Sequence, residues 1–128
     1  MLLLDTHAFV WLASAPKELS PPTRRAIQEN ADNLYISSIS ALEIAILVKR
    51  KRLSLPLDPA EFIDRALRQH GIREIPLDRS IAIASTRLAD IHNDPFDRIM
   101  VATAQLNGMS IVSRDRILRS YPEVKIIW

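Results

Sequence analysis

The chain has 128 residues, with 17 Lys and Arg against 15 Asp and Glu and a formal net charge of +2. This length is typical of one domain, so we expect residues 1–128 to form a single domain around a buried core. The absence of cysteine excludes disulfides, thiolate zinc sites and a cysteine nucleophile. Gly71 and Gly108 are the only glycines, too few for a dinucleotide-binding fingerprint or a phosphate-binding P-loop. No apolar run approaches the ~18 residues of a membrane span and no signal-peptide pattern is present, so the sequence predicts a cytoplasmic protein without membrane contact.

Short apolar segments alternate with helical segments along the whole chain. Strands are expected at residues 2–4, 34–37, 72–77, 110–113 and 124–127. Helices are expected at residues 7–14, 20–30, 38–52, 58–70, 78–89 and 94–107, with one more short helical segment before the last strand. This alternation is typical of an α/β fold with a mainly parallel sheet. Functional side chains in such sheets gather beyond the carboxyl ends of the strands, here just after Leu4, Ser37, Leu77 and Ser113.

Two acidic residues near the first and second strands have both a structural and a functional interpretation. Asp5 directly follows the first strand, where it suits either the N-cap of the next helix or a metal ligand. Glu43 is the only charged residue between Asn33 and Lys49. Its neighbours are apolar on nearly all sides, which predicts a buried helix in which an ionised Glu needs compensation. A capping box with Ser40, or a bound cation, would each provide it.

Three more acids lie near the last long helix and the strand after it. Asp94 suits the N-cap position before Pro95, and Asp97 suits the first turn, where the helix dipole favours a carboxylate. Asp115 follows Ile111 and Val112 in a position typical of a turn or cap. A parallel sheet nevertheless brings these acids, Asp5 and Glu43 to one edge. A divalent cation relieves the repulsion between such carboxylates, and oxygen ligands favour Mg²⁺ or Mn²⁺ over zinc.

Four segments make the chain resemble PIN-domain proteins, in particular the VapC-type toxins of bacterial toxin–antitoxin pairs. These segments are LLLDTHAFVWL, SISALEIAI, HNDPFDRIMVATA and IVSRD, in order and spread over essentially the whole chain. The resemblance implies a three-layer α/β/α fold whose five-stranded, mainly parallel sheet has the order 3-2-1-4-5. It also implies a catalytic and metal-binding quartet, which consists of Asp5, Glu43, Asp97 and Asp115. Supporting roles fall to Thr6, Asp94 and Ser113.

The same resemblance implies a toxin that cleaves RNA, an endoribonuclease in which Mg²⁺ or Mn²⁺ activates a water molecule. Its implied partners are the RNA substrate, a VapB-type antitoxin and a second copy of the chain. Arg98, Arg114 and Lys49 are weaker candidates for substrate contact, because the basic run at 49–52 equally suits the end of a helix. Leu42 and Leu47 stand where close relatives often carry Trp and Lys, a departure that bears on substrate or antitoxin binding. His92 is interpreted as a local hydrogen-bonding residue.

Three other functions are considered. A receiver-like phosphoacceptor domain also gathers carboxylates around Mg²⁺, but Asp5 is followed by Thr6 rather than by a second acid. A catalytically silent PIN-like module would bind RNA or protein without cleaving it. A metal-dependent DNA nuclease would use the same acids, because hydrolysis of a phosphodiester does not itself require the 2′-hydroxyl group.

Overall fold

The computed structural model describes residues 1–128, and its centre is a five-stranded sheet in the order β3-β2-β1-β4-β5. All four pairs of neighbouring strands are parallel. The strands are β1 (Leu2–Leu4), β2 (Leu34–Ser37), β3 (Arg73–Ile75), β4 (Ser110–Val112) and β5 (Ile126–Ile127). This confirms the α/β class and the strand order that the sequence implies. The sheet places β1 in the middle, with its carboxyl end between those of β2 and β4.

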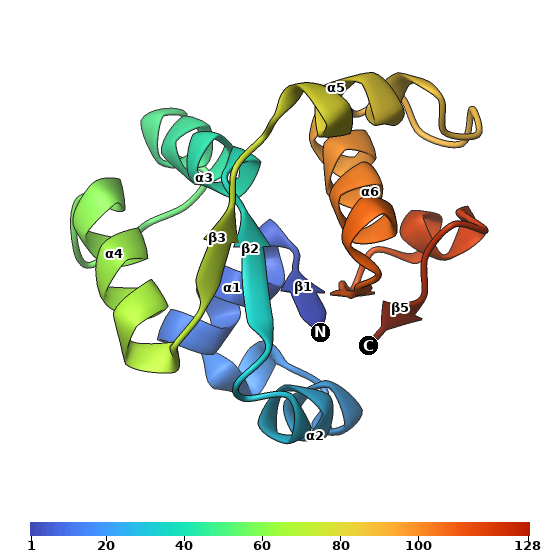
Figure 1. Ribbon diagram of the computed structural model, residues 1–128. Coiled ribbons are helices and arrows are strands. Elements are labelled where there is room, and N and C mark those ends of the chain that lie inside the picture. The colour runs from blue at the N-terminus through green and yellow to red at the C-terminus, as the bar shows by residue number, and fades with distance from the viewer.

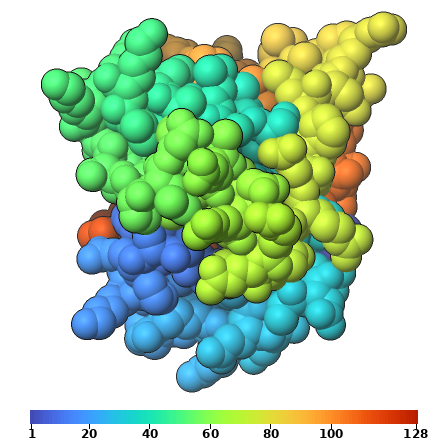
Figure 2. Space-filling model, turned by 90° about the vertical axis from the view of Figure 1, so that its left-hand side faces the viewer, coloured from blue at the N-terminus to red at the C-terminus, as the bar shows by residue number.

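Helices cover both faces of the sheet, which gives the three-layer α/β/α arrangement (Figure 1). The helices are α1 (Thr6–Ser14), α2 (Pro21–Glu29), α3 (Ile39–Lys49), α4 (Pro59–His70), α5 (Arg79–Thr86) and α6 (Pro95–Asn107), with short 3₁₀ helices η1 (Pro16–Glu18) and η2 (Arg116–Ser120). In Figure 1, α1 to α4 lie on one side of the sheet and α5 and α6 on the other. Figure 2 looks onto the first side, where α4 and the segment before it lie across the middle. No helix of the structure is both long enough and apolar enough to cross a membrane.

The alternation of side chains along the strands builds a separate core on each face. Leu2 and Leu4 of β1 pack with the core under α1 to α4, whereas Leu3 packs with the core under α5 and α6. Successive side chains of a strand point to opposite faces, so a strand buried on both faces reads as a continuous apolar run. Leu3 and its β4 neighbour Ile111 are both fully buried.

Several elements are shorter or more exposed than the sequence predicts. Strand β3 covers 73–75 rather than 72–77, β5 covers 126–127 rather than 124–127, and α5 ends at Thr86 rather than Ala89. The prediction that the helix carrying Glu43 is buried on nearly all sides is wrong. In α3 only Ser40 and Ile44 are buried, and Leu42 remains 51% exposed. The helix contacts α1, α4, α6 and β2, and most of its other apolar side chains are half-buried.

Replacing Leu3 with Ala tests the core of the sheet. The Leu3 side chain is fully buried between the sheet and α6. Its truncation to Ala leaves a cavity and is expected to reduce the free energy of unfolding by about 3 kcal/mol. Chemical denaturation measures this loss. Leu106→Ala is the matched control, because Leu106 is 53% exposed and its truncation should change stability by less than about 0.5 kcal/mol. Equal effects of the two substitutions would contradict the assignment of this core.

Candidate active site

A small pocket of about 150 Å³ lies beyond the carboxyl ends of the central strands, where the topology predicts a site. We call it the acid pocket. Its lining residues are Asp5, Thr6, His7, Glu43, Asp94, Asp97, Met100 and Asp115. The four acids of the predicted quartet therefore share one pocket with two of the three predicted supporting residues. The third, Ser113, is fully buried directly below at the end of β4.

Three of the acids cap a helix and face the acid pocket at the same time. In each case the Oδ1 atom of the acid accepts a hydrogen bond from a backbone amide of the helix. Asp5 accepts from Ala8, Asp94 accepts from Phe96, and Asp115 accepts from Ile117. These bonds are 2.7, 2.9 and 2.9 Å long. Each cap uses Oδ1, and the Oδ2 atoms of Asp94 and Asp115 form no hydrogen bond within the chain. The structural and functional interpretations of these acids are therefore compatible, because one carboxylate serves both.

Burial places Asp5 under electrostatic strain. The pKa of its carboxyl group is raised above the usual range, first by the loss of solvation on burial and further by the nearby charge of Glu43. Hydrogen bonding to Ser113 and to the amide of Ala8 opposes this shift. The Ser113 hydroxyl also accepts a 3.0 Å hydrogen bond from the amide of Asp115, so it links two of the acids.

Asp97 carries the largest number of like-charged neighbours. Burial first, and then the carboxylates of Asp94, Asp115 and Glu43, raise its pKa to about 7, although His92 opposes the shift. The Nε2 atom of His92 lies 3.4 Å from Oδ2 of Asp97. The Nδ1 atom of His92 accepts a 3.1 Å hydrogen bond from the amide of Asp94, which leaves the proton on Nε2, facing Asp97. The local role expected for His92 is thus a specific one, the orientation of Asp97.

The capping box proposed for Glu43 is wrong. Ser38, not Ser40, precedes α3, and the hydroxyl of Ser40 instead accepts a 3.1 Å hydrogen bond from Thr6. Thr6 and Ser40 are both buried, so this bond ties the start of α1 to α3. The side chain of Glu43 forms no hydrogen bond or ion pair within the chain. This half-buried residue lines the acid pocket, where its carboxylate is free to act.

The donor set suits a hard divalent cation. Oxygen ligands predominate, and burial together with neighbouring carboxylates raises the pKa of Asp5 and Asp97, an effect that a bound cation would oppose. Ligand atoms of His92, Asp94 and Asp97 lie within 4.8 Å of one another, the only such group in the chain. Asp94, expected from the sequence to have a supporting role, is thus placed with Asp97 in the group whose geometry could hold an ion. The position of His92 two residues before Asp94 is the sequence feature that could have placed it at the site.

The weaker predictions for substrate contact have different outcomes. Arg98 is a structural residue: its guanidinium donates four hydrogen bonds of 3.1 Å to backbone carbonyl groups. The acceptors are Ser85, Leu88, Ala89 and His92. With four of its five N–H groups engaged, Arg98 is not available to bind phosphate and is removed from the candidates. Lys49 is exposed at the far end of α3, six residues from Glu43 or roughly 9 Å along the helix. Arg114 is exposed beside Asp115, with its guanidinium over the ring of Trp11.

Comparison with known proteins identifies the family of the chain. The sequence profile described as the PIN domain matches residues 2–124. Ribonuclease VapC22 of Mycobacterium tuberculosis is 33% identical over 130 residues, which cover 99% of this chain and 98% of that protein. The chain belongs to the VapC-type PIN-domain family. The resemblance of its sequence motifs to this family is therefore confirmed.

Solved structures show the same PIN-domain fold at lower identity. The crystal structure of VapBC2 from Rickettsia felis, bound to a DNA fragment from its promoter, has a TM-score of 0.72 at 16% identity, with 98% of this chain and 96% of that chain covered. The crystal structure of DNA-bound VapBC from Salmonella typhimurium has a TM-score of 0.69 at 20% identity, with 98% and 95% covered. At these identities the agreement concerns the fold alone.

Asp97→Asn tests the electrostatic strain in the metal-free PIN domain. Because the pKa of Asp97 is raised to about 7, the folded protein keeps a proton that the unfolded chain loses near pH 4. Stability therefore falls as pH rises through this window and stays low above pH 7. Asp97→Asn removes that penalty and should raise the free energy of unfolding at pH 8 by about 1 kcal/mol, less than the whole shift would give because the carboxylate is partly exposed.

Thermal unfolding in EDTA from pH 4 to pH 8 measures this difference, which should shrink toward the acidic end. Asp32→Asn is the control, since Asp32 is exposed at the opposite end of the sheet. A variant that is less stable than wild type at pH 8 would contradict the assignment of unrelieved repulsion to Asp97.

Proposed function

We propose that this PIN domain is the toxin of a toxin–antitoxin pair and that it acts as a metal-dependent endoribonuclease. The observation that carries the proposal is the convergence of Asp5, Glu43, Asp97 and Asp115 in one pocket of a PIN fold, with two of their pKa values raised. RNA as substrate is supported by the identity to a protein named as a ribonuclease. We infer that residues 1–128 act as one PIN domain, and we place the protein in the cytoplasm, where a chain without cysteine needs no disulfides.

We assign the metal-holding role to Asp5, Asp97 and Asp115, with Asp94 beside them, and the metal to Mg²⁺ or Mn²⁺. When bound there, such an ion supplies positive charge that stabilises the leaving oxygen and lowers the pKa of water. Asp94 and Asp115 each present a free Oδ2 atom, and the helix caps fix the direction of all three capping carboxylates. Thr6 and Ser113 hold the backbone at the two strand ends and keep the acids at these positions.

The residues of the chain then orient and deprotonate the attacking water. Glu43 is the acid without any partner in the chain, and we assign to it the proton that leaves the water molecule. The water oxygen forms a bond to phosphorus while the bond from phosphorus to the 3′ oxygen breaks, and that oxygen takes a proton from solvent. No side chain forms a covalent intermediate in this scheme, which agrees with the lack of cysteine.

We further propose two protein partners, a VapB-type antitoxin and a second copy of the chain. The solved structures of similar fold are VapBC complexes, which supports the antitoxin. Exposed apolar side chains support the homodimer, because contact of an apolar side chain with water costs free energy that an interface would recover. Leu42 is 51% exposed, Leu77 39% and Ile83 44%. They lie on α3 and at α5, near the end of the sheet that holds the acid pocket.

Asp5→Asn tests the reaction. The substitution keeps the size of the side chain and the Oδ1 cap, but it removes a charge from the acid pocket, and cleavage of single-stranded RNA in Mg²⁺ should fall by at least about 100-fold. Gel analysis of labelled RNA measures the rate, and circular dichroism checks the fold. Asp32→Asn should cleave like wild type, and EDTA should abolish cleavage by wild type.

The same assay separates the proposal from its alternatives. A wild-type protein that binds RNA but never cleaves it would indicate a silent binding module. Cleavage of single-stranded DNA in preference to RNA of the same sequence would indicate a DNA nuclease. Wild-type cleavage rates in Asp5→Asn would exclude the assigned mechanism.

Leu42→Asp tests the homodimer. A charge in an apolar contact should weaken dimerisation at least about tenfold, which size-exclusion chromatography with light scattering detects as a shift toward monomer. Ile117→Asp is the matched control, because Ile117 is 48% exposed on η2, away from α3 and α5. A wild-type protein that remains monomeric at high concentration would remove the prediction.

A further inference from the structure

A second hollow, of about 500 Å³, lies beside the acid pocket and has the opposite charge. It is lined by Arg114, Arg116, Arg119 and Trp128, and we call it the arginine pocket. The loop after β4 contributes to both hollows, because Arg114 and Arg116 line the arginine pocket and Asp115, between them in sequence, lines the acid pocket. The volume lies within the range of roughly 300–1,000 Å³ that is usual for ligand sites.

The three arginines of the pocket have no acidic partner. Their side chains are exposed, form no salt bridge and donate no hydrogen bond within the chain. Arg98, in contrast, is held by four backbone carbonyl groups. Three unpaired guanidinium groups around one hollow repel each other, and a ligand that carries several negative charges would relieve this repulsion.

A row of aromatic rings connects the acid pocket to the arginine pocket. The ring centroids of His7 and Trp11 lie 5.6 Å apart, and those of Trp11 and Trp128 lie 5.7 Å apart. His7 lines the acid pocket and Trp128 lines the arginine pocket. The guanidinium of Arg114 lies 6.0 Å from the centre of the Trp11 ring. Both indole rings are partly exposed, so each has surface available to a flat ligand.

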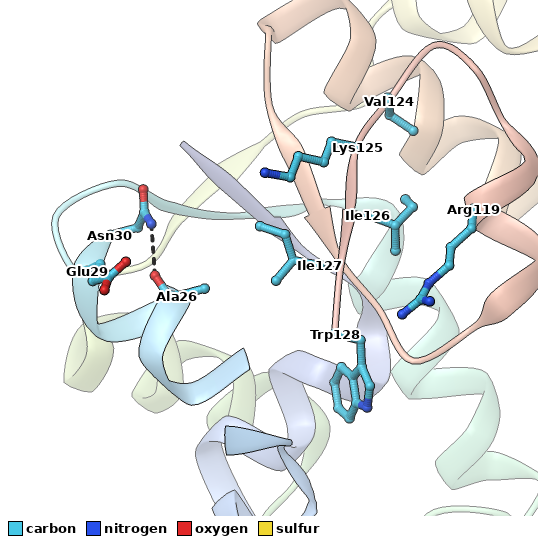
Figure 3. Close-up of a pocket in the computed structure, with 9 residues that line it drawn as sticks. All are labelled: Ala26, Glu29, Asn30, Arg119, Val124, Lys125, Ile126, Ile127 and Trp128. Carbon is cyan, nitrogen blue, oxygen red and sulfur yellow. Dashed lines mark hydrogen bonds between the residues drawn. The ribbon is translucent and has the colours of Figure 1, made fainter. Parts of the chain in front are cut away.

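The hollow continues beyond the arginine pocket as a groove of about 750 Å³ between α2 and β5. The groove and the arginine pocket share Arg119 and Trp128. Figure 3 shows these two side chains at one end of the groove and Lys125 projecting across it toward α2. Glu29 and Asn30 of α2 close the far end. A cationic, aromatic path thus runs from the acid pocket along the edge strand β5.

We propose that the arginine pocket and the row formed by Trp11 and Trp128 bind the single-stranded segment of RNA next to the phosphate that is cleaved. This proposal rests on the proposed ribonuclease function. The arginines contact successive phosphates, and bases stack on the indole rings, the combination by which proteins hold single strands without reading sequence. Paired bases have no free face for such stacking. An acidic peptide would satisfy the arginines but would leave the indole rings without a partner.

Binding is measured by fluorescence anisotropy with a labelled 20-nucleotide single-stranded RNA, in an Asp5→Asn background so that the RNA stays intact. The double variant Arg116→Gln/Arg119→Gln should bind about tenfold more weakly. The slope of log affinity against log salt concentration should fall by roughly 1.4, because each phosphate contact on a single strand contributes ~0.7. The matched control, Arg65→Gln/Arg79→Gln, removes the same charge from exposed arginines elsewhere and should leave the slope unchanged.

Stacking gives an independent readout. Trp128→Ala should weaken binding roughly tenfold without a change in the salt slope, and Trp128→Phe should restore most of the affinity. A strand with abasic sites should bind weakly to the protein that retains Trp128, and Trp128→Ala should show little further loss on this strand. Circular dichroism checks that the variants are folded.

The outcomes distinguish this inference from the proposed function. If wild type cleaves RNA and the double variant binds and cleaves as wild type does, the arginine pocket is not a substrate site, although the ribonuclease function stands. If wild type binds a polyglutamate peptide more tightly than RNA of equal charge, and Arg116→Gln/Arg119→Gln removes that binding, the pocket belongs to an acidic protein segment and the inference is overturned. A tenfold preference for double-stranded over single-stranded RNA would also overturn it.

Discussion

Carboxylates crowded at one edge of a parallel sheet are the constraint on which the rest of this structure depends. Parallel strands direct their carboxyl ends to the same edge, so Asp5 and Asp115 meet there although they are distant in sequence, and the first turn of α6 brings Asp97 to them. Burial and mutual repulsion raise the pKa of Asp5 and of Asp97. The fold tolerates this cost because strands buried on both faces provide a core on each side of the sheet. Helix caps then hold Asp5 and Asp115 in place by one oxygen each.

The distribution of basic residues follows from the same constraint. The chain as a whole carries a net charge of only +2, yet five of its 15 acids line the acid pocket and three arginines line the arginine pocket. Arg98 differs from its neighbours because it fixes the segment between α5 and α6 and so positions His92. A polyanion that approaches this edge meets unpaired cations first and the carboxylates only at the bottom of the pocket, an arrangement that suits electrostatic guidance of a substrate.

The sequence predicted the strand order through its motifs and the acid pocket through the position of acids after apolar runs. Caps were predictable because Asp before Pro, or Asp after a strand, is a local signal. Glu43 was harder: the pattern Ser40-x-x-Glu43 fits a capping box, but Ser40 is bound by Thr6, which is 34 residues away. The exposure of α3 and the carbonyl contacts of Arg98 also depend on packing between distant segments. Periodicity describes one helix and does not report which neighbour covers it.

The central position of β1 has a consequence for the order in which the protein is made. The first strand to leave the ribosome is the one whose partners, β2 and β4, come from the second and the last quarter of the chain. Asp5 is therefore synthesised more than a hundred residues before Asp115. A partial chain that ends before Asp115 lacks one of the acids, and a parallel sheet forms only after long loops have closed. The acid pocket is thus completed only when β4 and the loop that carries Asp115 join β1, so its assembly waits for the last quarter of the chain.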